Sequence, residues 1–229
     1  MAAESFAAIY ARAAERKGGE RGLEALVSQP LSPAGVKALS DDRVLSAFTK
    51  KVFQSGFVWR VIEQKWPEFE ALFFNFEVEK VLLMSDEMLE QRATDKRIVR
   101  NLKKVMTIRD NALMLNDIRL SHTSFGKFAS QFTGAAVIDL WAHLKKHGAR
   151  LGGNTGPYAL RALGIDTFLL SRDVEGYFRA YDLISGGLTS KQSLTTIANT
   201  FADWQAQSGR SLQELSQIPD QSHISCLEG

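Results

Sequence analysis

The sequence has few of the features that mark secreted, disulfide-stabilised or membrane-spanning proteins. Its 229 residues include a single cysteine, Cys226, which excludes an intrachain disulfide and any metal site built on cysteines. No apolar run approaches the roughly 18 residues that a membrane-spanning helix needs. Glu4, Arg12 and Glu15 fall where a signal peptide would have its apolar core. We therefore expect a cytoplasmic protein with no membrane partner.

The chain also lacks a strong charge of either sign. Its formal net charge is +2, with 24% charged and 45% hydrophobic residues, an ordinary composition for a globular protein. A net charge this small does not by itself argue for nucleic acid, so such a function must depend on local clusters of charge. A chain of this length can bury a core of its own, and we expect one domain.

Apolar residues recur at helical spacing throughout, and no segment alternates as a strand would. The longest stripe comprises Leu45, Phe48, Val52, Trp59, Ile62 and Trp66. The pattern predicts an all-α protein. The expected helices cover residues 5–16, 23–26, 41–66 (interrupted by Pro67), 78–84, 86–92, 98–120 and 135–147, one that Thr155 caps, one from Ser171 through Tyr181, one that Thr189 or Ser190 caps, and one from Ser211 that Pro219 ends.

The stretch 144–173 contains the most informative motif, a helix, a glycine-rich hairpin and a second helix. Gly148 is placed to stop the first helix, and Pro157 is accepted in the first turn of the second, where its missing N–H has no intrahelical partner. Free N–H groups at a helix start bind anions. Basic residues just before this turn make nucleic-acid phosphate the natural anion; they are Lys145, Lys146 and Arg150.

Two blocks of the chain resemble one known family. The first is Gln54-Ser-Gly56-x-x-Trp59, followed by Phe69, Phe73, Phe76, Val81, Met84, Ile98, Val99, Arg100, Asn101, Lys104, Asn111 and Ala112. The second is Leu144-Lys-Lys-x-Gly148 with Gly153-x-Thr155-x-x-Tyr158. In the order and spacing of these residues the chain, over residues 44–181, is similar to the constitutive 3-methyladenine DNA glycosylases, the Tag family of the helix-hairpin-helix glycosylase superfamily.

The resemblance implies an all-α, two-lobed helix-hairpin-helix DNA glycosylase fold. We expect one domain over residues 1–229, in which helices of residues 1–33 and 188–219 pack on a core of residues 44–181. The cleft would lie between a lobe of residues 44–120 and one of residues 133–181. The implied function is base-excision repair, by hydrolysis of the N-glycosidic bond of an alkylated (3-methyladenine-like) or otherwise damaged base. The expected partner is double-stranded DNA containing damaged bases, bound by a monomer without a cofactor.

The resemblance also implies roles for individual residues. Trp59 would stack the flipped-out base, while Gln54 and Lys51 read its edge and Tyr10 stands for the family's N-terminal tyrosines. Asp173, in the first turn of the helix after the hairpin, would border the same cleft and stabilise positive charge on the sugar. The expected DNA-binding residues are Gly153, Asn154, Thr155, Gly156, Tyr158, Lys145, Lys146, Arg100 and Lys104.

The sequence departs from the family in several places. Lys51 stands where the family has a base-reading glutamate, and a positive charge there favours a neutral or acceptor-rich base over cationic 3-methyladenine. The family's cysteine and histidine zinc ligands are absent, and we expect no metal site; His143 and His147, four apart on one helix, are the pair to check. Pro157 occupies the position of the Schiff-base lysine of bifunctional relatives, so we expect a monofunctional enzyme.

Some of these residues have a second interpretation. Trp59 also lies on the apolar stripe and could belong to the core, and Asp173 could simply stabilise the start of its helix. The basic residues between positions 92 and 109 either follow phosphates or form a solvated helix face. For the whole protein, the alternatives are a non-catalytic helix-hairpin-helix protein that binds damaged DNA, and a helical protein-interaction module. Release of a free base from damaged DNA distinguishes the enzyme from both.

Overall fold

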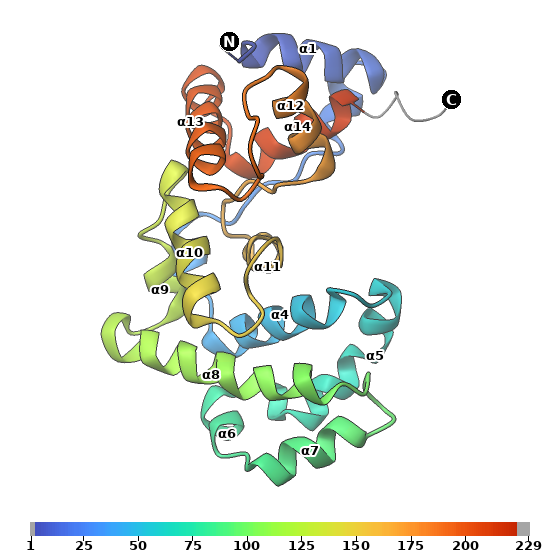
Figure 1. Cartoon of the computed structure of the whole chain (residues 1–229), viewed down its shortest axis with the longest axis vertical. Coiled ribbons are helices and arrows are strands. Elements are labelled where there is room, and N and C mark those ends of the chain that lie inside the picture. The colour runs from blue at the N-terminus through green and yellow to red at the C-terminus, as the bar shows by residue number, and fades with distance from the viewer. Residues whose placement is uncertain (1–2, 224–229) are drawn as a thin grey trace. The chain divides into compact units, whose positions relative to one another are not determined.

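The computed structural model describes residues 3–223, with side chains through residue 219, and helices are the only regular secondary structure in this part of the chain. The prediction of an all-α protein is therefore confirmed. The chain divides into two compact units (Figure 1). The central unit comprises Leu31–Phe132 and Asp139–Ile165, and the terminal unit comprises Met1–Pro30, Thr133–Ile138 and Asp166–Gly229. The described helices include none that is both long and apolar enough to cross a membrane.

Most helices belong to one unit or the other. The central unit contains α3 (Pro33–Lys37), α4 (Asp41–Gln54), α5 (Trp59–Leu72), η1 (Phe74–Phe76), α6 (Val78–Leu82), α7 (Asp86–Thr94), α8 (Leu102–His122), α9 (Phe125–Ala129) and α11 (Thr155–Ala162). The terminal unit contains α1 (Phe6–Arg16), α2 (Glu20–Glu24), η2 (Gly134–Ala136), α12 (Arg172–Ala180), α13 (Lys191–Ser208) and α14 (Leu212–His223). Helix α10 (Val137–His147) begins in the terminal unit and continues into the central one. These boundaries differ from the expected lobes, because the hairpin helix α11 groups with α4 and α8.

The expected helix over residues 41–66 is two helices. Helix α4 ends at Gln54 and α5 begins at Trp59, and between them Gly56 has a φ of 85°, a left-handed conformation that glycine adopts without strain. Pro67 was predicted to interrupt this segment, and that was wrong, because it lies inside α5. Buried residues on both sides of it, Trp66 and Phe69, hold the helix to the core across the missing hydrogen bond. Pro219 likewise lies inside α14 instead of ending it.

The core of the central unit is rich in aromatic rings. Trp66 stacks on Phe69 and on Phe76, with ring centroids 5.0 and 5.5 Å apart. Its indole Nε1 donates to Glu70 Oε1 at 3.0 Å, and Arg43 holds the same carboxylate with two hydrogen bonds of 3.0 and 2.9 Å. This cluster fixes α5 against α4, and so fixes where the first residue of α5 lies.

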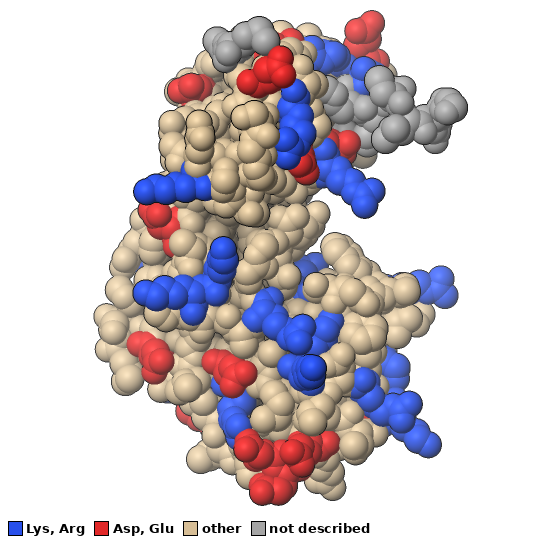
Figure 2. Space-filling model, in the orientation of Figure 1, with Lys and Arg blue, Asp and Glu red and all other residues tan. Residues whose placement is uncertain are grey.

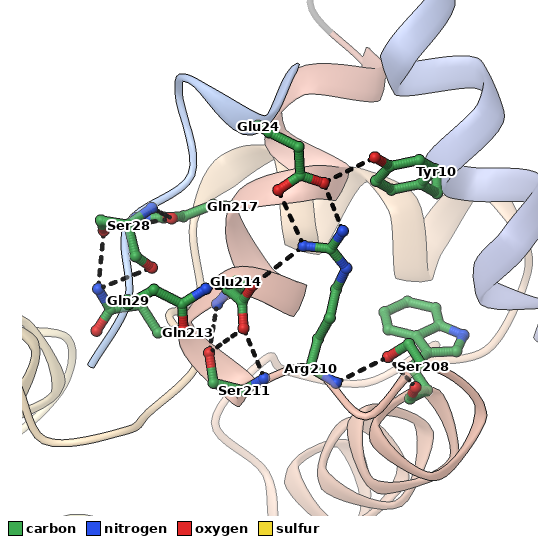
Figure 3. Close-up of polar contacts among 11 residues, drawn as sticks. Tyr10, Glu24, Ser28, Gln29, Ser208, Arg210, Ser211, Gln213, Glu214 and Gln217 are labelled. Atoms are coloured by element: carbon green, nitrogen blue, oxygen red, sulfur yellow. Dashed lines mark hydrogen bonds and ion pairs between the residues drawn. The ribbon is translucent and has the colours of Figure 1, made fainter. Parts of the chain in front are cut away.

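A network of polar contacts links several helices of the terminal unit (Figure 3). Arg210 hydrogen-bonds Glu24 of α2 and Glu214 of α14, the latter at 3.0 Å, and lies under the ring of Tyr10, 5.0 Å from its centroid. Ser211 and Glu214 form a capping box, in which Glu214 Oε2 accepts from the Ser211 amide at 2.9 Å and the Glu214 amide donates to Ser211 Oγ at 3.2 Å. These contacts connect α1, α2 and the start of α14.

Candidate functional site

A pocket of about 180 Å³ lies in the central unit between the end of α4, the start of α5 and the hairpin helix α11. Six of the residues expected in the site line it, together with Ser55. The lining residues are Lys51, Gln54, Ser55, Trp59, Asn154, Thr155 and Tyr158. The structure thus brings together the segments around Gln54 and around Thr155, although they are about a hundred residues apart in the sequence. The roles assigned to these residues stay predictions.

Trp59 belongs to the pocket and not to the core. Its side chain is 51% exposed, whereas the other residues of the predicted stripe are buried. Its ring meets that of Tyr158 edge to face, with centroids 6.1 Å apart. Trp59 keeps its helical spacing to the buried Ile62 and Trp66, but it is the first residue of α5, and its exposure follows from this place at the end of the helix beside the pocket. The core interpretation of Trp59 was therefore wrong.

Lys51 lies over the indole of Trp59, with Nζ 4.6 Å from the ring centroid. Nζ also donates to Gln54 Oε1 at 2.8 Å, and Gln54 Nε2 donates to Glu63 Oε1 at 2.8 Å. Both ends of the buried Gln54 amide are therefore occupied, which fixes its orientation. Burial lowers the pKa of Lys51, and the nearby Glu63 carboxylate partly opposes this shift.

The hairpin before α11 is held by a buried side chain of α8. Asn111 is fully buried; its Oδ1 accepts from the Ala149 amide at 2.8 Å and its Nδ2 donates to the Ala149 carbonyl at 3.2 Å. Helix α10 ends just before Gly148, as predicted, but the left-handed residues come later, at Arg150 (φ 60°) and Gly153 (φ 59°). The N-cap of α11 is Asn154 instead of Thr155.

The backbone amides of the hairpin differ in whether their N–H groups are free to donate a hydrogen bond to an anion. The Gly156 amide donates to the Leu151 carbonyl at 3.1 Å and the Thr155 amide to the Gly152 carbonyl at 3.3 Å. Within the described residues, no acceptor is found for the Gly153 amide. Gly156 is needed for space, because a Cβ there would lie 2.5 Å from the Leu151 carbonyl oxygen, whereas a Cβ on Gly153 would meet nothing within 4 Å.

The predicted basic contacts divide into exposed and buried residues. Lys145, Lys146 and Arg100 are exposed. Lys104 is buried: its Nζ donates to the carbonyls of Phe53 and Ser55, and burial lowers its pKa. Lys104 therefore ties the end of α4 to α8, which supports a structural role in place of the predicted phosphate contact. Figure 2 shows lysine and arginine gathered over the part of the central unit that holds α4, α8 and α11, while acidic side chains gather over α6 and α7.

Two predicted site residues belong to the terminal unit. Asp173 lies in the first turn of α12, whose N-cap Ser171 accepts from the Val174 amide at 3.1 Å, as predicted. The Tyr10 hydroxyl donates to Glu24 Oε1 at 2.7 Å, a bond that raises the pKa of Tyr10. That Asp173 borders the same cleft as Trp59 stays a prediction.

The structure contains a second pocket, of about 370 Å³, between α8 and α10, which the sequence did not predict. His122, His143 and His147 line it with Asp110 and Asp117. Burial is the main cause that lowers the pKa of His143. Within the described residues, no set of three or more histidine, cysteine, aspartate or glutamate side chains is arranged to hold a metal ion. Cys226 and the side chain of His223 lie outside the described part, so the absence of a metal site stays a prediction.

A family model for methyladenine glycosylases matches residues 34–151. The chain belongs to this family. The assignment supports a base-excision repair DNA glycosylase, a hydrolase, and does not favour a non-catalytic protein. The matched residues include Lys51, Gln54 and Trp59, and they end at Leu151, just before the glycines of the hairpin.

Solved structures of methyladenine glycosylases have the same fold at low sequence identity. The Staphylococcus aureus 3-methyladenine DNA glycosylase I is 22% identical with a TM-score of 0.50, and the alignment covers 62% of this chain and 82% of that one. A tyrosine-to-phenylalanine variant of a 3-methyladenine DNA glycosylase I in complex with 3-methyladenine is 23% identical with a TM-score of 0.51, covering 61% and 82%. No curated protein matches the chain significantly.

Proposed function

We propose that the pocket around Trp59 receives a damaged base flipped out of double-stranded DNA, and that the protein hydrolyses the N-glycosidic bond as a monomeric, monofunctional DNA glycosylase. The observation that carries this proposal is the exposed ring of Trp59 facing Tyr158 in a pocket of about 180 Å³. Stacking on an aromatic side chain contributes about 1–3 kcal/mol per base. A buried ring would have offered no such surface.

The hairpin and its lysines supply a means of holding the DNA backbone beside this pocket. Asn154 and Thr155 line the pocket and also begin α11, so a phosphate at the hairpin would lie close to a base in the pocket. The Gly153 amide and the exposed Lys145 and Lys146 are the donors that we assign to the phosphate. Arg100, exposed on the same unit, is a further phosphate contact.

We assign Asp173 the stabilisation of positive charge that develops on the sugar as the base departs. The start of a helix favours a negative charge, and such a charge beside the sugar suits this role. The hydrogen bond of Tyr10 to Glu24 and its contact with Arg210 support a structural role for Tyr10 in place of the predicted contact with the base.

The proposal is tested by measuring base release and DNA binding separately. Duplexes carrying one damaged base are incubated with the wild-type protein and with Trp59→Ala, and the free base is quantified by chromatography. We expect release by the wild type and a loss of at least tenfold in the variant. Salt-dependent binding without any release would identify the non-catalytic binder, and the absence of salt-dependent binding would identify the protein-interaction module.

A further inference from the structure

The pocket around Trp59 carries a positive charge and no negative one. Of the seven lining residues none is an aspartate or a glutamate, and Lys51 is the single lysine among them. The Glu63 carboxylate does not line the pocket and accepts from Gln54 Nε2 and from Lys50 Nζ at 2.8 and 3.1 Å, so it offsets this charge only in part. A cationic base would therefore enter a pocket that already carries a positive charge.

Lys51 already makes the cation–π contact with Trp59 that would otherwise favour a cationic base. A cation over an aromatic face is attracted by the negative face of the ring. In this chain the ammonium over Trp59 belongs to the protein, with Nζ 4.6 Å from the ring centroid. A positively charged base stacked on the same ring would be repelled by that ammonium and would lose the advantage that it has over an undamaged purine.

The ammonium of Lys51 still has donors available for a base. It carries three N–H donors, of which the bond to Gln54 Oε1 uses one. Gln54 is buried, and its amide already accepts from Lys51 through Oε1 and donates to Glu63 through Nε2. An ammonium group bonds acceptor atoms on a base edge, such as a carbonyl oxygen or an unprotonated ring nitrogen, and has nothing to offer a donor.

The charge of the base also decides what its departure requires. An alkylated cationic base takes the electron pair of the C1′–N bond and leaves as a neutral molecule. A neutral base that takes the same pair leaves as an anion, and a general acid or a fixed positive charge must stabilise it. An ammonium in the pocket can act as the general acid and also as the positive charge.

We propose that Lys51 provides, from the protein, the positive charge that an alkylated base would bring with it, so that the substrate is a neutral damaged base with acceptors on its edge, such as a deaminated purine. This inference rests on the proposed glycosylase function. As the C1′–N bond breaks, its electron pair goes to the base and the base takes a proton from the Lys51 ammonium. Water adds to C1′ and loses one proton to solvent, and Lys51 regains its proton from solvent.

The experiment compares single-turnover base release from duplexes containing hypoxanthine, ethenoadenine or uracil with release from methylated DNA containing 3-methyladenine. We expect the wild type to act faster on at least one neutral lesion than on 3-methyladenine. Lys51→Met should slow release of the neutral lesion by about 10²–10⁴-fold, the usual contribution of a general acid, without slowing release of 3-methyladenine. Lys51→Glu should accelerate release of 3-methyladenine.

Two further variants separate proton transfer from charge and from folding. Lys51→Arg keeps the positive charge but cannot release its proton near neutral pH, and should retain DNA binding while losing most of the rate on the neutral lesion. Lys50→Met, next in sequence but outside the pocket lining, should leave both rates unchanged. Circular dichroism establishes that each variant is folded.

The inference is overturned if the wild type releases 3-methyladenine faster than every neutral lesion, or if Lys51→Met slows both classes equally. Either result leaves the proposed glycosylase function intact. If the wild type releases no base from any of the four duplexes, the proposed function itself is wrong, and the inference with it.

Discussion

Lys51 and Trp59 are in contact because a turn separates their helices. They are eight residues apart, and in a continuous helix they would be about 12 Å apart along the axis. The turn at residues 55–58 lets Trp59, at the start of α5, fold back so that its ring lies 4.6 Å from Lys51 Nζ. The contact thus depends on the break between α4 and α5, and Lys104 stabilises that break by bonding the carbonyls of Phe53 and Ser55.

Two tryptophans of α5 should respond oppositely to truncation. Trp59 is 51% exposed and Trp66 is buried in the aromatic core. We expect Trp59→Ala to abolish most base release while changing the free energy of unfolding by less than about 1 kcal/mol. Trp66→Ala should destabilise by ~3–5 kcal/mol. Urea denaturation and base-release assays on both variants check this, and a large destabilisation by Trp59→Ala would contradict the exposed position.

Gly153 tests the hairpin as a phosphate site. A bulky residue there, as in Gly153→Phe, has room for its Cβ but needs a strained φ of 59°, and its side chain would stand beside the amide assigned to phosphate. We expect weaker binding to duplexes of any sequence, measured by fluorescence anisotropy. Gly187→Phe, an exposed glycine without positive φ, is the matched control. Unchanged affinity of a folded Gly153→Phe protein would remove the hairpin from the interface.

Lys145 and Lys146, before the hairpin, should contribute to the salt dependence of DNA binding. Each phosphate contact contributes about one unit to the slope of log K against log salt concentration. The double variant Lys145→Gln, Lys146→Gln should therefore reduce the slope by up to about two. Lys80→Gln, on α6 and paired with Glu77 at 2.8 Å, should leave it unchanged. Equal slopes for the double variant and the wild type would show that these lysines do not contact DNA.

Asp173 is tested by removing its charge. Asp173→Asn should abolish base release and leave DNA affinity largely intact, because the hairpin lies elsewhere in the chain. Glu175→Gln is a control in the same helix, where Glu175 pairs with Arg179 at 2.7 Å. Retention of full activity by Asp173→Asn would mean that the acid only stabilises the start of α12.

The stability of the protein should fall at high pH because of Tyr177. Burial raises the pKa of this phenol to about 12, whereas an unfolded tyrosine ionises near 10. Between these values the unfolded state has lost the proton that the folded state keeps, so the free energy of unfolding falls as pH rises from about 10 to about 12. Tyr177→Phe should lose part of this pH dependence. Urea denaturation from pH 8 to pH 11.5 measures it, and identical profiles for the two proteins would contradict the assignment.

The sequence predicted correctly those features that depend only on residues within one helix turn. Thr189 or Ser190 was predicted to cap one helix, and Ser190 does so by accepting from an amide three residues on, because a cap is a contact between near neighbours. The helix expected from Ser171 likewise has that serine as its N-cap. Signals that depend on neighbours far along the chain were less reliable. The prolines at 67 and 219 were predicted to end helices, but each lies inside one, and the buried Trp66 and Phe69 hold α5 together across Pro67.

The sequence by itself determined that the chain is all-α and which family it belongs to, because helical periodicity and the order of motif residues are properties of the chain alone. Only the tertiary structure decided which predicted residues are accessible. It exposed Trp59 and buried Lys104, two residues that the sequence had given similar standing. The physical reason is that exposure depends on contacts between α4, α8 and α11, and these residues come together only when the helices pack.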